Sequence, residues 1–290
     1  MLSMAFESTS EGLKISDIEP RVPPLGGTKI VIQRHGEYDR SEESAKPGSL
    51  TEEASKSVQE HAQKFVNQLL ATLPPEERDT VDFLVLASDT RFRDRQDYGQ
   101  RSMETAQAVV SGIKEVLQAI ESSDDHLLNT SGKFHGSGGP RPTKQIREPK
   151  VFRDSPEFVK FLEAHYGKDK DFWVAFESDQ EEKKREEMGA EGPWEMAERL
   201  AHYVDVLARF SRDYHERNPG RRLVVWAVSH YDLLSPYAKR YLSGLSKTDY
   251  LPVDYGAGIS IDVDSSGKAT TTFGGTQIKV PGRYFNNSTD

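Results

Sequence analysis

Short apolar runs rich in β-branched residues alternate along this chain with longer stretches of helical period. The runs have the composition of buried strands and cover residues 28–33, 82–88 and 223–228. Apolar residues three or four apart predict helices near residues 51–73, 102–120 and 193–217. Strands that alternate with helices form a largely parallel sheet covered on both faces. The sequence therefore predicts an α/β fold, a three-layer α/β/α sandwich with a mostly parallel central sheet.

The remaining segments predict one domain with two insertions. Residues 1–27 end in a Pro- and Gly-rich stretch and are expected to be an N-terminal lead-in to a single domain over residues 28–285. Residues 121–144 hold many Ser, Asp and Gly residues and are expected to form an inserted surface loop. The charged, helical sequence of residues 155–191 is expected to form a cap-like insertion. Residues 259–273 predict two further strands joined by a turn.

Composition excludes several classes of function. The chain has 47 acidic and 38 basic residues, a net charge of −9, which disfavours broad nucleic-acid binding. It has no cysteine, which rules out disulfides, zinc–thiolate sites and a thiol nucleophile. No apolar run approaches the ~18 residues of a membrane span, and no secretory signal is recognisable. We therefore expect a cytoplasmic protein without nucleic-acid or membrane partners; the sequence does not indicate an oligomeric state.

Histidine and arginine side chains follow the predicted strands directly. Arg34 and His35 follow the first strand, and His230 follows the third. The second is followed by an arginine-rich loop that holds Arg91, Arg93 and Arg95. Ligands of such sheets gather at the carboxyl ends of the strands. One histidine at a strand end is usually structural, but two that meet arginines at one rim predict a site for an anion.

Five motifs, in order, resemble those of the histidine phosphatase superfamily, which is also called phosphoglycerate-mutase-like. They are IVIQRHGE (30–37), GSLT (48–51), RSMETA (101–106), GPWEMAER (192–199) and VVWAVSH (224–230). A lone Arg-His-Gly is a weak signal, whereas five ordered matches over roughly residues 28–275 are specific. The resemblance implies the phosphoglycerate-mutase-like version of the predicted α/β fold.

The resemblance also implies roles for individual residues. His35 is the nucleophile that forms a phosphohistidine, Arg34 and Arg101 clamp the phosphate, and His230 makes a further phosphate contact. No metal or other cofactor is implied, because arginine and histidine supply the positive charge. The leading expectation is a metal-independent phosphatase that hydrolyses a small phosphomonoester. The alternatives are a mutase of the phosphoglycerate mutase type and a non-catalytic phospholigand-binding protein.

The second clamping arginine has competitors. Arg101 stands thirteen residues after Ser88, a wider gap than the family usually has, and Arg91, Arg93 and Arg95 fall inside that gap. Arg101 is preferred because it keeps the family's spacing to Thr105 and Ala106 at the start of a helix.

Three carboxylates compete for the role of general acid, which protonates the leaving oxygen. Asp154 comes first, because residues 150–154 resemble the family segment that ends in Leu-x-Glu, with residues 150–152 expected to be extended. Glu148 comes second. Asp232 comes third: a distant branch of the superfamily places its acid directly after the second histidine, but here Tyr231 intervenes.

Overall fold

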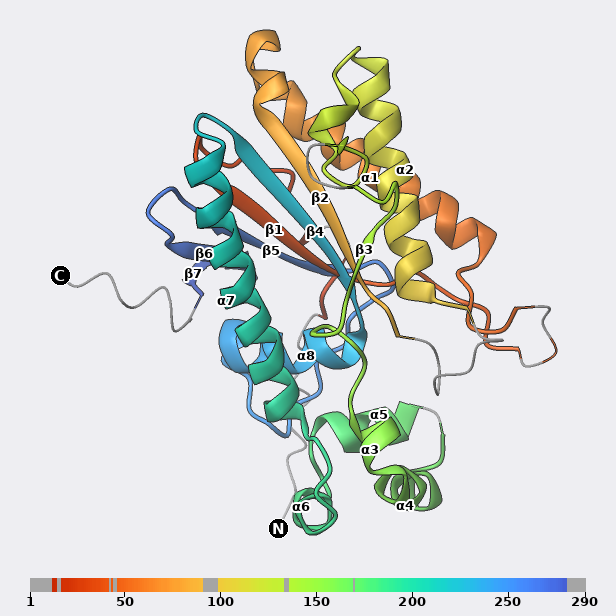
Figure 1. The fold of residues 1–290 in the computed structure, drawn as a ribbon. Helices are drawn as coiled ribbons and strands as arrows, with labels where there is room; N and C mark the ends of the chain where they lie inside the picture. Colours follow the sequence, from red (N-terminus) through yellow and green to blue (C-terminus); the bar gives the residue numbers. More distant parts are fainter. Residues whose placement is uncertain are drawn as a thin grey trace.

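The computed structural model describes residues 12–14, 17–41, 43, 46–90, 99–132, 136–168 and 170–280. Within them lies one sheet with the strand order β3-β2-β4-β1-β5-β6-β7 (Figure 1). The strands are β1 Thr28–Arg34, β2 Val81–Ser88, β3 Arg141–Thr143, β4 Arg222–Ser229, β5 Gly258–Val263, β6 Ala269–Phe273 and β7 Thr276–Lys279. Strands β1 to β4 run parallel, and β5, β6 and β7 pair antiparallel at one edge. The predicted three-layer fold with a parallel centre is confirmed.

Helices cover both faces of the sheet (Figure 1). Helices α1 Glu52–Ala71 and α2 Arg101–Ala119 pack on one face, and α7 Pro193–Arg217 and α8 Tyr231–Ala238 pack on the other. Shorter helices follow β3: α3 Val151–Asp154, α4 Pro156–Tyr166, α5 Lys170–Glu177 and α6 Glu182–Glu187. Within the described residues, no helix combines the length and the apolarity needed to cross a membrane.

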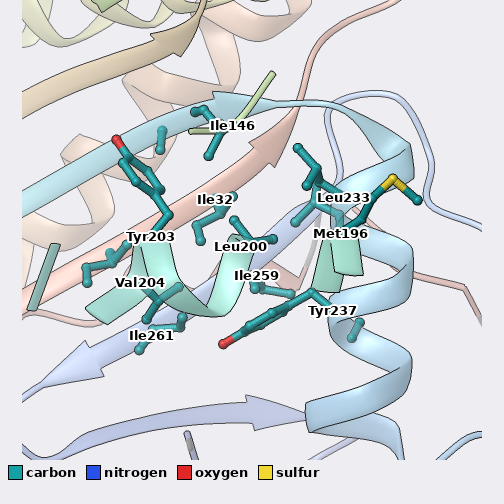
Figure 2. Packing of buried hydrophobic residues seen from close by; sticks show 14 of the residues in the cluster. Ile32, Ile146, Met196, Leu200, Tyr203, Val204, Leu233, Tyr237, Ile259 and Ile261 are labelled. Atoms are coloured by element: carbon teal, nitrogen blue, oxygen red, sulfur yellow. The ribbon is translucent and has the colours of Figure 1, made fainter. Parts of the chain in front are cut away.

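The alternation of side chains along the strands creates two separate cores. In β1, Ile30 and Ile32 point toward α7 and α8, whereas Val31 between them packs with α1 and α2. The core beneath α7 and α8 contains Leu200, Val204 and Tyr237 (Figure 2). Strands buried on both faces carry apolar residues toward both faces, which explains the consecutive apolar residues 30–32, 83–87 and 223–228 of β1, β2 and β4.

Helix boundaries follow local capping chemistry. The Thr51 hydroxyl accepts a hydrogen bond from the backbone N–H of Ala54 at 3.1 Å and begins α1, and Pro74 and Pro75 follow its end. Gly192 precedes α7, and Pro193 occupies the first turn, where its missing N–H costs nothing. These ends match the sequence predictions.

Two local predictions are wrong. Residues 121–144 are not only a surface loop, because they contain β3 and the buried Leu127 and Leu128. In the same segment the Asn129 side-chain amide bonds both the N–H and the C=O of Val85, as another strand would. Residues 150–152 are not extended, because helix α3 begins at Val151. In the described part of the lead-in, Leu13 and Ile18 are buried.

Candidate active site

The parallel pairing of β1 with β4 places two histidines side by side. Arg34 is opposite Ser229 in the ladder, so His35 and His230 each stand one residue beyond the last pair. Their ring centroids are 5.4 Å apart and their planes make an angle of 67°. Both side chains are almost fully buried. The two strand ends therefore lie side by side, as the sequence predicts.

The hydrogen bonds of His35 fix its tautomer. Nδ1 lies 2.8 Å from the Gly36 carbonyl oxygen, which can only accept, so Nδ1 carries the proton. Nε2 is then the unprotonated nitrogen, and it accepts a hydrogen bond from Arg101 Nε at 3.0 Å. Burial lowers the pKa of His35 well below its usual value, and the charges of Arg101, His230 and Arg34 lower it further. The ring is a neutral imidazole with its lone pair on Nε2.

Arg34 and Arg101 are held over aromatic rings. The Arg34 guanidinium lies 3.9 Å from the ring centre of Tyr255 and donates from Nη1 to the Val253 carbonyl. The Arg101 guanidinium lies 4.6 Å from the ring centre of Tyr38. Cation–π contacts and hydrogen bonds fix the planes of both groups. Two oriented guanidinium groups beside a neutral imidazole suit a bidentate oxyanion.

His230 has a different set of partners. Its Nε2 lies 2.9 Å from the Ser88 hydroxyl and 3.4 Å from the Ser102 hydroxyl. Its Nδ1 is buried and has no hydrogen-bond partner among the described residues. Burial lowers the pKa of His230 well below its usual value, and neighbouring arginines add to the effect. A hydroxyl can donate to an unprotonated ring nitrogen or accept from a protonated one. The hydroxyl partners of His230 therefore allow its ring to gain a proton when an anion approaches.

These groups form one end of a pocket of about 740 Å³. Arg34, His35, Arg101 and His230 line that end, and Lys168, Lys170 and Trp173 from the insertion line another part. The pocket-lining residues include four with a buried polar atom that no described residue bonds: Arg34 Nε, His230 Nδ1, Tyr231 OH and Asp232 Oδ1. Buried polar groups are nearly always bonded in native proteins, so this concentration marks a place for a polar ligand.

The structure does not bring Asp154, the preferred acid, to the pocket. Its side chain is 49% exposed, and it forms an ion pair with the neighbouring Arg153 at 2.6 Å. That arginine holds the pKa of the Asp154 carboxyl below its usual value. Because residues 151–154 form helix α3 instead of an extended segment, this carboxylate lies on the surface.

The other two carboxylates lie close to the cationic end. Glu148 Oε2 is 3.8 Å from Arg101 Nη2, and this side chain is 19% exposed. Asp232 lines the pocket in the first turn of α8. Burial raises the pKa of Asp232 to about 7, although Arg101, Arg199 and Arg34 oppose that rise. Of the arginines proposed to compete with Arg101, Arg91, Arg93 and Arg95 all lie outside the described residues.

Several residues of the site were missed in the sequence. Thr105 was noted only for its spacing from Arg101, and its role was missed: its hydroxyl accepts from the Gly36 N–H at 3.0 Å and donates to the Arg101 carbonyl at 2.7 Å. It thereby ties the His35 loop to the first turn of α2, which explains the four-residue spacing from Arg101. Tyr38 and Tyr255, which support the guanidinium groups, carry no local signal because only the fold brings them to the arginines.

Metal ligands do not cluster in the described part of the chain, where no group of three histidine, aspartate or glutamate side chains is arranged to hold an ion. Positively charged side chains line the pocket: Arg34, Arg40, Arg101, Lys168 and Lys170.

Neither a search of protein-family models nor a search of curated proteins finds a match to this chain. Solved structures do match. A phosphoglycerate mutase from Bacillus anthracis is 17% identical, over 87% of this chain and 94% of that one, with a TM-score of 0.45. A mycobacterial protein described as hydrolase 1 is 14% identical, over 86% and 99%, with a TM-score of 0.45. A mycobacterial glucosyl-3-phosphoglycerate phosphatase is 13% identical, over 80% and 89%, with a TM-score of 0.40. Likenesses this distant assign no activity to this chain.

Proposed function

We propose that the protein is a phosphatase that hydrolyses a small phosphomonoester through a phosphohistidine on His35. The convergence of His35, His230, Arg34 and Arg101 on one pocket carries the proposal. A single catalytic domain over residues 28–285, preceded by the lead-in of residues 1–27, performs the reaction. No metal takes part, because the side chains supply the charge that a phosphoryl group needs.

In the first step, His35 Nε2 attacks phosphorus. The N–P bond forms as the bond from phosphorus to the ester oxygen breaks, and the leaving oxygen takes a proton from a carboxylic acid. In the second step, water attacks phosphorus, gives its proton to the resulting carboxylate and releases inorganic phosphate with restoration of His35. The hydrogen bond from Arg101 Nε to His35 Nε2 must break before His35 can attack. A phosphate oxygen is the stronger acceptor for that N–H, so substrate binding uncovers the nucleophile.

The cations stabilise the charge that spreads over the non-bridging oxygens in the transition state. Arg34 and Arg101 are each oriented by a tyrosine ring and need little reorganisation. His230 Nδ1 has no partner among the described residues, so a phosphate oxygen satisfies it. The negative charge of the phosphate raises the pKa of His230 and favours a cationic ring there. Hydrogen bonds to charged groups contribute about 1.5–3 kcal/mol each.

We assign the proton transfer to Glu148. Its carboxylate lies beside Arg101, whose Nε contacts the reacting nitrogen, and its partial exposure lets it exchange protons with water. The alternative is Asp232, whose pKa of about 7 keeps it protonated at acidic pH. The surface position of Asp154 argues against it.

The first experiment measures phosphate release from p-nitrophenyl phosphate between acidic and neutral pH with a chelator present. The wild-type protein should release phosphate, and His35→Ala should release none, because no other described group offers a lone pair at the same point. His165→Ala is the matched control, since His165 is an exposed histidine of α4. Acid-labile, base-stable phosphate trapped on the wild-type protein identifies the phosphohistidine. Full activity of His35→Ala refutes the mechanism.

The same experiment separates the rival functions. Transfer of the trapped phosphoryl group to an added alcohol in preference to water indicates a mutase. Tight phosphate binding without turnover indicates a non-catalytic binding protein.

The acid is identified by leaving-group dependence. A variant without its proton donor should lose activity on alkyl phosphates, which need the proton, and retain activity on p-nitrophenyl phosphate, which does not. We expect this pattern for Glu148→Gln and not for Asp232→Asn. Asp154→Asn is the control and should match the wild-type protein on both substrates. If only Asp232→Asn loses activity on alkyl phosphates while it retains activity on p-nitrophenyl phosphate, Asp232 is the proton donor.

A further inference from the structure

The pocket differs in chemistry between its two ends. Arginine and histidine side chains from the ends of β1 and β4 and from the start of α2 form one end, which the proposed function uses. Three aromatic side chains line another wall: Trp173 from α5, Tyr231 from α8, and Tyr250 from the segment between α8 and β5. The Trp173 and Tyr231 ring centres are 6.2 Å apart, and those of Tyr231 and Tyr250 are 6.4 Å apart. The three rings, here called the aromatic wall, are in contact in series: Trp173 meets Tyr231 edge to face at 88°, and Tyr231 and Tyr250 are tilted by 50°.

The aromatic wall is continuous with the aromatic rings that support the arginines. Tyr38 and Tyr255 lie within 5 Å of a guanidinium group, and the Arg34 guanidinium also lies 5.4 Å from the Tyr231 ring centre, so Tyr231 joins the wall to the cationic end of the pocket. Trp173 is only half-buried, although its ring also contacts Phe172 of the insertion at 5.2 Å between centres. The Tyr231 hydroxyl is buried and bonds no described residue, which points to a ligand group beside it.

The pocket is also larger than a phosphate group needs. Its volume of about 740 Å³ falls in the range of pockets that enclose organic ligands of drug size, roughly 300–1,000 Å³. The part beyond the cationic end must therefore receive the alcohol portion of the ester. Aromatic side chains prefer stacked or edge-to-face contacts with other planar rings, and this preference adds to simple apolar burial.

We infer that the substrate is a phosphomonoester whose alcohol portion carries a planar aromatic ring held by Trp173, Tyr231 and Tyr250. The inference rests on the proposed function for the phosphate end of the ligand. The insertion of residues 155–191 supplies Trp173 and so selects the substrate, whereas the strand ends supply the chemistry.

Two esters test this inference on the wild-type protein: 2-phenylethyl phosphate and 2-cyclohexylethyl phosphate. The ring is two carbons from the ester oxygen in both, so the two leaving groups have nearly the same basicity. The cyclohexyl ring has more apolar surface, so a merely hydrophobic wall favours it. An aromatic wall should instead give the phenyl ester the higher kcat/KM, by about three- to tenfold. A ratio of one or below overturns the inference.

Variants locate the preference. Trp173→Leu should reduce the ratio of the two kcat/KM values toward one. Trp194→Leu is the matched control, because Trp194 is a half-buried tryptophan that packs on Arg240 and does not line the pocket; its ratio should stay as in the wild-type protein. If thermal unfolding shows that Trp173→Leu disturbs the insertion, the same ratio is measured for Tyr250→Leu instead. An unchanged ratio in both pocket variants refutes the assignment to this wall.

Binding of phosphonates separates failure of this inference from failure of the proposed function. 3-Phenylpropylphosphonate and 3-cyclohexylpropylphosphonate replace the ester oxygen by carbon and cannot be hydrolysed. If calorimetry shows tighter binding of the phenyl compound but neither ester is hydrolysed, the proposed phosphatase function is refuted, and the preference for an aromatic ligand is supported. If both esters are hydrolysed equally well and both phosphonates bind equally, the preference for an aromatic ligand is refuted, and the proposed phosphatase function is supported.

Discussion

Replacing Thr105 by valine tests whether the link between the His35 loop and helix α2 positions the reacting groups. The Thr105 side chain is fully buried, and its hydroxyl accepts from Gly36 N–H at 3.0 Å while donating to the Arg101 carbonyl at 2.7 Å. Valine has nearly the same shape and a similar helix propensity, so the change removes the hydroxyl with little other disturbance.

The expected magnitude follows from the hydrogen bonds that are lost. Gly36 N–H would remain buried without a partner, which costs about 1–3 kcal/mol of unfolding free energy. The Arg101 carbonyl keeps its place in the first turn of α2, so its loss is smaller. Because Gly36 directly follows His35, release of this N–H lets the imidazole move relative to the Arg101 guanidinium. A displacement of about 1 Å between reacting groups costs up to 100-fold in rate. We expect kcat to fall roughly 10- to 100-fold.

Urea unfolding gives the stability change, and hydrolysis of p-nitrophenyl phosphate gives kcat and KM. Thr271→Val is the matched control: the Thr271 hydroxyl is also buried and donates to the Ser260 carbonyl at 2.6 Å, but it lies on β6, away from the pocket. The control should lose about 1 kcal/mol of stability and keep its kcat. If Thr105→Val loses stability but retains wild-type kcat, Thr105 stabilises the fold without positioning the catalytic groups, and the reasoning fails.

Three further changes should have measurable effects. The Asp232 carboxyl has a pKa of about 7 in the folded protein and about 3.9 when unfolded, so the folded state keeps a proton that the unfolded chain loses. The contribution of Asp232 to the free energy of unfolding should therefore fall as the pH rises from about 4 to 7, opposite in sign to the contributions of His35 and His230, whose pKa values burial lowers. In urea titrations, the unfolding free energy of the wild-type protein minus that of Asp232→Asn should fall over this pH range, because the difference isolates the Asp232 contribution. Replacing Lys168 and Lys170 at the pocket by serine should raise KM a few-fold at low ionic strength, and by less in about 0.5 M salt. Lys239→Met should lower the free energy of unfolding by about 3–5 kcal/mol, because it leaves the buried Glu177 carboxylate, now 3.3 Å from Lys239 Nζ, without its cation; adding Glu177→Gln should restore part of the loss.

The sequence predicts those parts of the fold whose local pattern agrees with their environment. Strands β1, β2 and β4 have consecutive apolar residues at their centres because they are buried on both faces, and α1 begins after the threonine that caps it. Strand β3 escapes prediction for a physical reason. It has three residues, Arg141–Thr143, with a proline in the middle, and only pairing with β2 makes it a strand. Proline is tolerated there because β3 is an edge strand.

In the candidate site, too, the sequence predicts some residues and not others. His35 and His230 could be found because each follows a strand that the apolar pattern predicts, and parallel pairing brings such ends together. The order of the three candidate acids could not be predicted, because the positions of these carboxylates depend on contacts from elsewhere in the chain. Glu148 is held at its backbone, where its N–H donates to the Thr90 hydroxyl and its carbonyl accepts from Arg199, both at 3.4 Å. Helix α3 begins three residues later and turns Asp154 to the surface.

The two histidines share one environment, so their different roles must arise from their partners. Both are buried, and in both burial and the nearby arginines lower the pKa. His35 donates its only proton to a carbonyl oxygen, which cannot donate in return, so Nε2 keeps its lone pair. His230 faces hydroxyl groups, which adapt to either protonation state. An arriving phosphate dianion offsets the arginine charges at both rings. In the proposed reaction, that change protonates His230, whose Nδ1 has no partner among the described residues, and it leaves the His35 ring neutral because phosphorus, not a proton, approaches its Nε2.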